Sequence, residues 1–103
     1  MKAPIRTGIL GLGRIGQLHA RNLAALPDFE LIAGADAYLT PEKEQTAKEI
    51  GIPIVGTDPE IVFSHPDIDA VAILSTTETH SDFIIRAAKA GKHVIVEKPI
   101  DIS

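Results

Sequence analysis

The feature of this sequence that most constrains its fold is a regular alternation of short apolar segments with longer amphipathic ones. The apolar segments, such as "DAVAILS" at 69–75, are apolar almost throughout, as expected for strands that are covered on both faces. The amphipathic segments carry helix boundary signals, with Thr40 and Pro41 opening one helix and Gly51 and Gly91 ending two of them. The predicted strands are 5–10, 29–36, 52–55, 69–75 and 93–97, and the predicted helices are 14–26, 41–50, 58–64 and 80–90, the last with Thr79 as its cap.

This order of elements predicts an α/β fold with a doubly wound parallel sheet of the Rossmann type. Right-handed crossovers between consecutive strands place them in the order 3-2-1-4-5. Ligands of such sheets bind outside the carboxyl ends of the strands, so we expect a crevice above strands one and four. The length of 103 residues suits one domain of this kind.

The segment "GLGRIG" contains three glycines directly after the first predicted strand and at the start of the first helix. Gly11 permits a tight turn, Gly13 lets a pyrophosphate approach the backbone, and Gly16 lets the helix pack close to the strand. Arg14 and Ile15 open the helix, whose free N–H groups favour an anion, and are predicted to bind the cofactor with the glycines. A plain strand-to-helix turn is the alternative.

Asp36 closes the second predicted strand, twenty residues after Gly16. An acid at this position can accept hydrogen bonds from both hydroxyls of an adenosine ribose, and it repels a 2′-phosphate. It therefore favours NAD over NADP as the cofactor. The alternative is that Asp36 only starts the turn before Thr40. Tyr38 either flanks the adenine or is a half-exposed loop residue.

Polar residues follow the fourth strand at the edge where the ligand is expected. Ser75, Thr76 and Thr77 lie where the nicotinamide end of a dinucleotide would be, and their hydroxyl and amide groups suit ribose or diphosphate. Helix capping is the alternative for Thr77. His80 follows in the first turn of the next helix, where a structural or solvated role competes with cofactor binding.

Glu97 and Lys98 end the fifth strand at the same edge. An ammonium group at Lys98 can reach a substrate hydroxyl or the nicotinamide ribose and stabilise charge that develops on oxygen, which makes it the predicted catalytic residue. Glu97 can hold Lys98 in place or hydrogen-bond near the nicotinamide ring. A surface ion pair is the alternative.

The composition indicates which partners are unsuited to this chain. Its net charge of −4 and its ten scattered Lys and Arg residues disfavour nucleic acid and membrane surfaces. It contains no cysteine, which excludes disulfides and thiolate metal sites and fits the cytoplasm. No apolar run approaches the ~20 residues of a membrane helix. We expect a cytoplasmic, dinucleotide-binding protein without a metal site.

Two stretches, "GILGLGRIGQLHARNL" and "DIDAVAILSTTETHSDFIIRAAKAGKHVIVEKP", with Asp36 between them, resemble the glucose–fructose oxidoreductase, inositol dehydrogenase and MocA-like oxidoreductases. The sequence Glu97-Lys98-Pro99 after a Rossmann unit is the most specific part of the resemblance, and the ending "EKPIDIS" is most similar to the inositol 2-dehydrogenases. The resemblance implies a Rossmann domain that binds NAD or NADP and a Lys98 that contacts substrate and cofactor.

The resemblance also places Thr76, Thr77 and His80 near the nicotinamide, although many family members have proline where Thr77 stands. Members of the family are much longer and add a second domain that supplies most of the substrate pocket. Residues 1–103 are therefore expected to be an incomplete enzyme. The full enzyme would move a hydride between nicotinamide and a sugar or polyol carbon.

Two further functions stay open, a dinucleotide-binding module without enzymatic activity and a minimal Rossmann fragment. The fifth strand is expected to lack the neighbouring strand and the domain that cover it in the family. We therefore expect a homo-oligomer that forms through residues 93–103 or through the uncovered face of the sheet.

Overall fold

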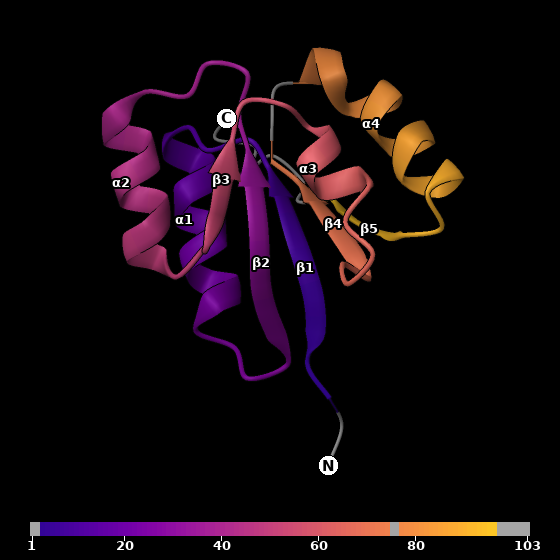
Figure 1. The fold of residues 1–103 in the computed structure, drawn as a ribbon, viewed down its shortest axis with the longest axis horizontal. Helices are drawn as coiled ribbons and strands as arrows, with labels where there is room; N and C mark the ends of the chain where they lie inside the picture. Colours follow the sequence, from indigo (N-terminus) through magenta and orange to yellow (C-terminus); the bar gives the residue numbers. More distant parts are fainter. Residues whose placement is uncertain (1–2, 75–76, 97–103) are drawn as a thin grey trace, which may run out of the picture.

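A computed structural model describes the backbone of residues 3–74 and 77–96, and the side chains of residues 3–74 and 81–95. These residues form a parallel five-stranded sheet in the order β3-β2-β1-β4-β5, which confirms the predicted order (Figure 1). The strands are β1 (Ile5–Leu10), β2 (Phe29–Ala35), β3 (Ile54–Gly56), β4 (Ala70–Ile73) and β5 (His93–Val96). The helices are α1 (Arg14–Ala24), α2 (Pro41–Ile50), α3 (Glu60–Phe63) and α4 (Thr77–Lys89).

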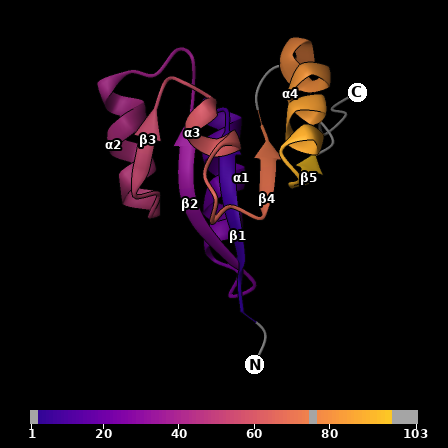
Figure 2. The same cartoon turned by 45° about the vertical axis from the view of Figure 1, so that its right-hand side comes forward.

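Helices cover both faces of the sheet, as the apolar strands predicted. Figure 2 shows α1 and α3 on opposite sides of β1. Neighbouring residues of β1 point to different faces, so Ile9 packs with Ala20 of α1, and Leu10 packs with Val62 of α3. All four of these side chains are almost fully buried. The two core layers hold the carboxyl ends of the strands together at one edge, where the candidate site lies.

The side of α1 that packs on the sheet next to the glycine turn consists of small residues. Ile15 and Leu18 are 61% and 51% exposed, whereas Gly16 and Ala20 are buried against the sheet. A Cβ atom added to Gly16 would lie 2.2 Å from the carbonyl oxygen of Gly11, so the helix approaches the strand too closely for a side chain there. This close approach supports the predicted packing role of Gly16.

The predicted bounds of α2 and the predicted start of α1 are confirmed, whereas α1 ends two residues earlier than predicted, α3 is shorter than 58–64, and α4 begins and ends before 80–90. Thr40 caps α2 by accepting a hydrogen bond from the Lys43 N–H at 3.2 Å. Gly51 and Gly91 end their helices with positive φ values of 110° and 73°. The prediction of Thr79 as the cap of the last helix is wrong, because α4 already begins at Thr77. No glycine or proline separates these two positions, so nothing in the local sequence stops the helix from extending.

The third strand begins two residues later and ends one residue later than predicted, since β3 spans Ile54–Gly56 rather than 52–55. Ile52 instead belongs to the core under α1 and α2 and is fully buried. A short apolar run predicts burial more reliably than it predicts the exact residues that pair in a sheet.

Helix α4 is anchored to α3 through Arg86. The guanidinium group of Arg86 forms ion pairs with Glu60 of α3 and, at 3.7 Å, with Asp82 of its own helix. It also lies over the ring of Phe63, 4.6 Å from the centroid, a cation–π geometry. Phe63 in turn contacts Phe83, with ring centroids 5.8 Å apart. These contacts position Phe83, which contributes to the site.

At the amino ends of the strands, opposite the candidate site, an exposed ion pair joins β1 to the turn before β4. The Arg6 side chain donates a hydrogen bond of 3.2 Å to Asp69. This bond lowers the pKa of Asp69 below its ordinary value of 3.8. The contribution of the pair to stability is therefore present above that pH and is lost as the pH falls through the lowered pKa.

Candidate functional site

A cavity of about 280 Å³ lies at the carboxyl ends of β1, β2 and β4, at the upper edge of the sheet in Figure 1. This is the location that the topology predicted for a ligand, since β1 and β4 are the strands between which the chain order reverses. Its described walls are formed by Leu10, Gly11, Gly13, Ala35, Asp36, Ala37, Tyr38, Lys43, Thr57, Pro59, Leu74 and Phe83.

The glycine turn lies on one wall of this cavity. Gly11 has a φ of 104°, a conformation that residues with a Cβ rarely adopt, and its N–H donates to the carbonyl of Ala35 at 2.9 Å. Gly13 is the N-cap of α1 and has no side chain to cap the helix. Among the described residues other than its two chain neighbours, no heavy atom lies within 4 Å of a Cβ added to Gly13. The open space leaves room for a ligand to approach the backbone.

Arg14 and Ile15 are the first two residues of α1, and both are exposed. The N–H groups in the first turn of a helix lack partners within the helix, and the helix dipole gives this end a partial positive charge. The start of α1 therefore offers hydrogen-bond donors to an anion beside the glycine turn.

Asp36 follows β2 directly and forms hydrogen bonds to the glycine turn and to the loop after β2, which lie on two sides of the cavity. Its Oδ2 accepts a hydrogen bond from the Leu12 N–H at 2.8 Å, and its Oδ1 accepts one from the Tyr38 N–H at 2.8 Å. The carboxylate is thus held in one orientation and is still 11% exposed at the cavity wall. Asp36 does start the turn after β2, as in the alternative interpretation, and this role leaves it in place for a ligand.

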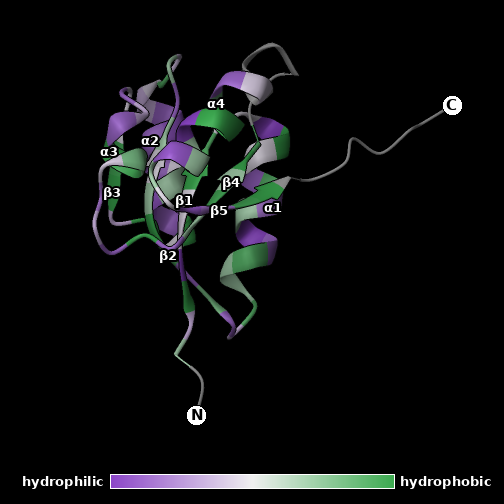
Figure 3. Cartoon of the chain, turned by 90° about the vertical axis from the view of Figure 1, so that its right-hand side faces the viewer, coloured by the Kyte–Doolittle hydropathy of each residue, from purple (hydrophilic) through white to green (hydrophobic). Residues whose placement is uncertain are grey.

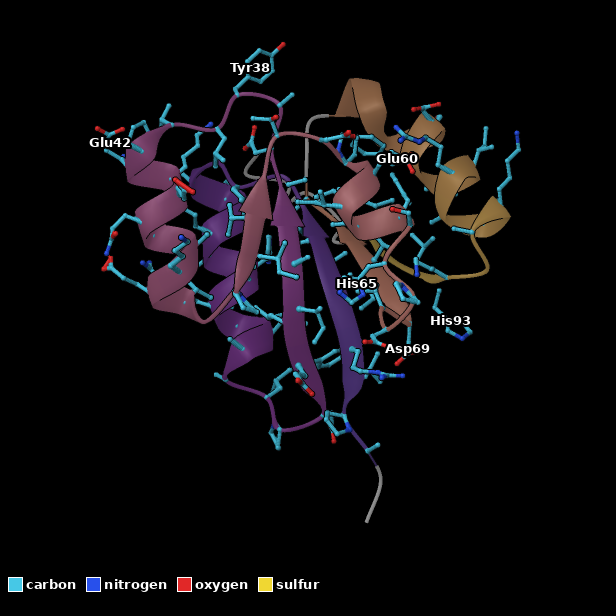
Figure 4. The ribbon with its side chains drawn as sticks, viewed as in Figure 1. Tyr38, Glu42, Glu60, His65, Asp69 and His93 are labelled. Atoms are coloured by element: carbon cyan, nitrogen blue, oxygen red, sulfur yellow. The ribbon has the colours of Figure 1, made fainter. Side chains whose placement is uncertain are left out.

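Lys43 is a residue of this cavity that was not predicted from the sequence. Its ammonium group lies 3.6 Å from Asp36 Oδ2 and donates a hydrogen bond of 3.1 Å to the carbonyl of Tyr38. The sequence signal that could have identified Lys43 is its position as the third residue of α2, because the helix dipole there favours an acid over a base. Tyr38 itself lines only the rim, because it is 82% exposed and its ring points into solvent (Figure 4).

The remaining predicted site residues belong to the segments that follow β4 and β5 in the sequence. The backbone of Thr77 and of His80 belongs to the start of α4, which follows the carboxyl end of β4. Their side chains lie outside the described residues, as do Ser75, Thr76, Glu97 and Lys98 entirely.

Two other kinds of site are not found within residues 3–74 and 77–96. No group of three or more His, Cys, Asp or Glu side chains is arranged to hold a metal ion in this part of the chain. None of its helices is both long enough and apolar enough to cross a membrane.

These features together define a class of protein. A turn with glycine at Gly11 and Gly13 leads into the N-terminus of a helix, and an acid at the end of the adjacent strand is hydrogen-bonded to that turn. This arrangement is that of a dinucleotide-binding Rossmann domain.

Comparison with known proteins identifies the family within this class. The model of the Gfo/Idh/MocA family, described as an oxidoreductase family with an NAD-binding Rossmann fold, matches residues 5–103. The chain belongs to this family, as its motifs predicted, and the matched residues form the family's NAD-binding Rossmann domain.

Several of the similar proteins are inositol dehydrogenases. The chain is 44% identical to the scyllo-inositol 2-dehydrogenase (NAD(+)) of Bacillus subtilis, over 100% of its own length and 30% of the relative's. It is 40% identical to the myo-inositol 2-dehydrogenase of Thermotoga maritima, over 96% of the chain and 29% of the relative. The chain therefore spans about 30% of the length of the curated relatives that it matches.

A solved structure supports the same relationship. The scyllo-inositol dehydrogenase of Lactobacillus casei, crystallised with NAD(H) and scyllo-inositol, matches with a TM-score of 0.82 and 39% identity. The match covers 98% of this chain and 30% of that one.

Proposed function

We propose that this domain binds NAD(H) in preference to NADP(H), for an enzyme that moves a hydride between nicotinamide and a hydroxyl-bearing carbon of an inositol-like polyol. The observation that carries the cofactor preference is the orientation of Asp36. Two backbone N–H groups hold its carboxylate at the cavity wall, where it can accept hydrogen bonds from ribose hydroxyls. A 2′-phosphate in that place would meet a fixed negative charge.

The described residues fit a dinucleotide. Gly11 and Gly13 line the cavity, Gly13 leaves room beside its backbone, and the first-turn N–H groups of α1, at Arg14 and Ile15, adjoin the same turn, as a pyrophosphate requires. Gly16 contributes through packing, since it allows α1 to begin close to β1.

The nicotinamide end of the proposed site rests on sequence position and family membership. We assign Ser75, Thr76, Thr77 and His80 to ribose, diphosphate or nicotinamide contacts. Glu97 is assigned to the orientation of Lys98 or to a contact near the ring.

Bound NAD would supply the hydride acceptor, and Lys98 would polarise the substrate hydroxyl and stabilise the negative charge that develops on its oxygen. The polyol substrate is proposed because the relatives carry the names of inositol dehydrogenases. Since the chain spans about 30% of their length, we expect these 103 residues to bind the cofactor without completing the reaction. The absence of cysteine supports a cytoplasmic location.

Titration of the chain with NADH and with NADPH, followed by the fluorescence of the nicotinamide, tests the proposed preference. We expect NADH to bind more tightly by about tenfold to a hundredfold, the effect of one like-charge contact. Asp36→Ala should narrow this gap, and Asp36→Asn should do so with less disturbance of the turn. Glu42→Gln is a matched control, because Glu42 is exposed on α2 and does not line the cavity. Equal affinities for the two cofactors in the unmutated chain would contradict the proposed role of Asp36.

We also propose that the chain forms a homo-oligomer through β5 or through the adjoining face of the sheet. In the described sheet β5 is an edge strand, and Figure 3 shows it largely in hydrophobic colours. Val94 and Ile95 are only partly buried, and no charge interrupts this part of the strand. Light scattering at micromolar concentration should give a mass above that of the monomer. A monomer mass that stays constant on tenfold concentration would refute the proposal.

A further inference from the structure

Lys43 occupies a position that its own helix makes unfavourable. It is the third residue of α2, where the first turn presents free N–H groups and a partial positive charge. Its backbone N–H already serves the cap by donating to Thr40. The side chain turns back over the preceding loop and lies on a wall of the cavity, where only 27% of it is exposed. A lysine needed only for solubility would extend into water instead.

The partners of the Lys43 ammonium group explain how this position is tolerated. It donates to the Tyr38 carbonyl at 3.1 Å and lies 3.6 Å from Asp36 Oδ2. Both partners belong to the loop that joins β2 to α2. An ammonium group has three N–H donors, so these contacts leave capacity for a further acceptor on the cavity side.

The two charges act in opposite directions on the same ligand group. A ribose hydroxyl that hydrogen-bonds to the Asp36 carboxylate comes to lie beside the Lys43 ammonium, since the two side chains are in contact. If that hydroxyl carries a phosphate, Asp36 repels it and Lys43 attracts it. In the unmutated chain Lys43 is partly neutralised by Asp36, which weakens its attraction for a phosphate.

We propose that Lys43 is a second determinant of cofactor choice. It can bind a 2′-phosphate, and the negative charge of Asp36 weakens this binding. The preference for NAD then reflects the balance of the two side chains rather than the acid alone. The inference rests on the proposed binding of NAD(H) at this cavity and adds a residue that accounts for the remaining affinity for NADP(H).

Four variants separate this role from a structural one. Lys43→Met and Lys43→Arg are made in the unmutated chain and in the Asp36→Asn chain, and each is titrated with NADH and NADPH by fluorescence. Competition with AMP and with adenosine 2′,5′-bisphosphate isolates the adenosine end of the cofactor. Lys48→Met is the matched control, since it removes the same charge from the last turn of the same helix.

In the Asp36→Asn chain, Lys43→Met should weaken NADPH and adenosine 2′,5′-bisphosphate about tenfold or more, the effect of one charge-assisted hydrogen bond. NADH and AMP should change much less. Lys43→Arg should retain most of the NADPH affinity. Added salt should reduce the effect of Lys43→Met on binding only for the 2′-phosphorylated ligands. In the unmutated chain, Lys43→Met should increase the preference for NADH.

Two results would overturn the inference in distinguishable ways. If Lys43→Met weakens NADH and NADPH equally in both chains, Lys43 only supports the loop and the inference fails, while the proposed function stands. If the unmutated chain binds neither NADH nor NADPH, the proposed function fails and the inference fails with it. Thermal unfolding of each variant shows whether a loss of binding reflects a loss of fold.

Discussion

Replacing Gly16 with alanine is expected to destabilise the fold by about 3 kcal/mol, although alanine is the better helix former. The added Cβ would lie 2.2 Å from the carbonyl oxygen of Gly11 and 2.9 Å from its carbonyl carbon. Both are backbone atoms of the glycine turn, so α1 would have to move away from β1. For a domain of this size the melting temperature should fall by roughly 12–24 °C, which circular dichroism would measure.

The direction of the stability change in Gly16→Ala distinguishes the two possibilities. Without the collision, Gly→Ala inside a helix would stabilise the chain by about 0.5–1 kcal/mol. Gly34→Ala serves as a control for the loss of a buried glycine, since its Cβ would meet its nearest heavy atom at 3.5 Å, an ordinary contact. An unchanged or raised melting temperature for Gly16→Ala would show that the close approach of α1 to β1 is not required.

Gly13→Ala should have the opposite profile, with a large effect on cofactor binding and little effect on stability. Apart from its chain neighbours, no described residue has a heavy atom within 4 Å of the added Cβ, so the unliganded domain can accommodate it. The stability should change by less than about 0.5 kcal/mol, because the weaker cap is offset by a more restricted unfolded chain. The new methyl group would stand where a pyrophosphate has to approach the backbone.

The affinity for NADH should therefore fall about tenfold to a hundredfold in Gly13→Ala, the loss of one or two charge-assisted hydrogen bonds. Fluorescence titration measures this loss, and a melting curve of the same sample shows that the fold is retained. An NADH affinity equal to that of the unmutated chain would contradict the placement of the pyrophosphate at Gly13. The pair of variants thus assigns packing to one glycine and ligand access to the other.

Much of this molecule could be predicted because its signals are local. The order of strands and helices follows from apolar runs and from boundary residues such as Thr40 and Gly51, which act on their immediate neighbours. The position of the cavity follows from topology, since the carboxyl ends of parallel strands share one edge. Gly11 and Asp36 could be assigned to that edge because each follows a strand directly.

The features that the sequence mispredicts depend on the distances between helices and strands. Hydrophobic periodicity carries no information on these distances. Ile15 and Leu18 of α1 are exposed, whereas Gly16, Ala20 and Leu23 of the same helix are buried, because the close approach at Gly16 fixes which side of the helix packs on the sheet. The start of α4 at Thr77 is also not fixed by the local sequence, since several positions there can begin a helix.

The sequence alone thus determined the fold class, the family and the edge of the sheet that carries the site. Only the tertiary structure decided how the site residues act on one another. Asp36 holds the glycine turn through Leu12, which lies 24 residues away in the chain, and it meets Lys43 because the Lys43 side chain turns back over the loop that joins β2 to α2. Such contacts depend on how strands and helices pack at ångström precision, whereas sequence patterns specify only which residues are buried and where elements begin and end.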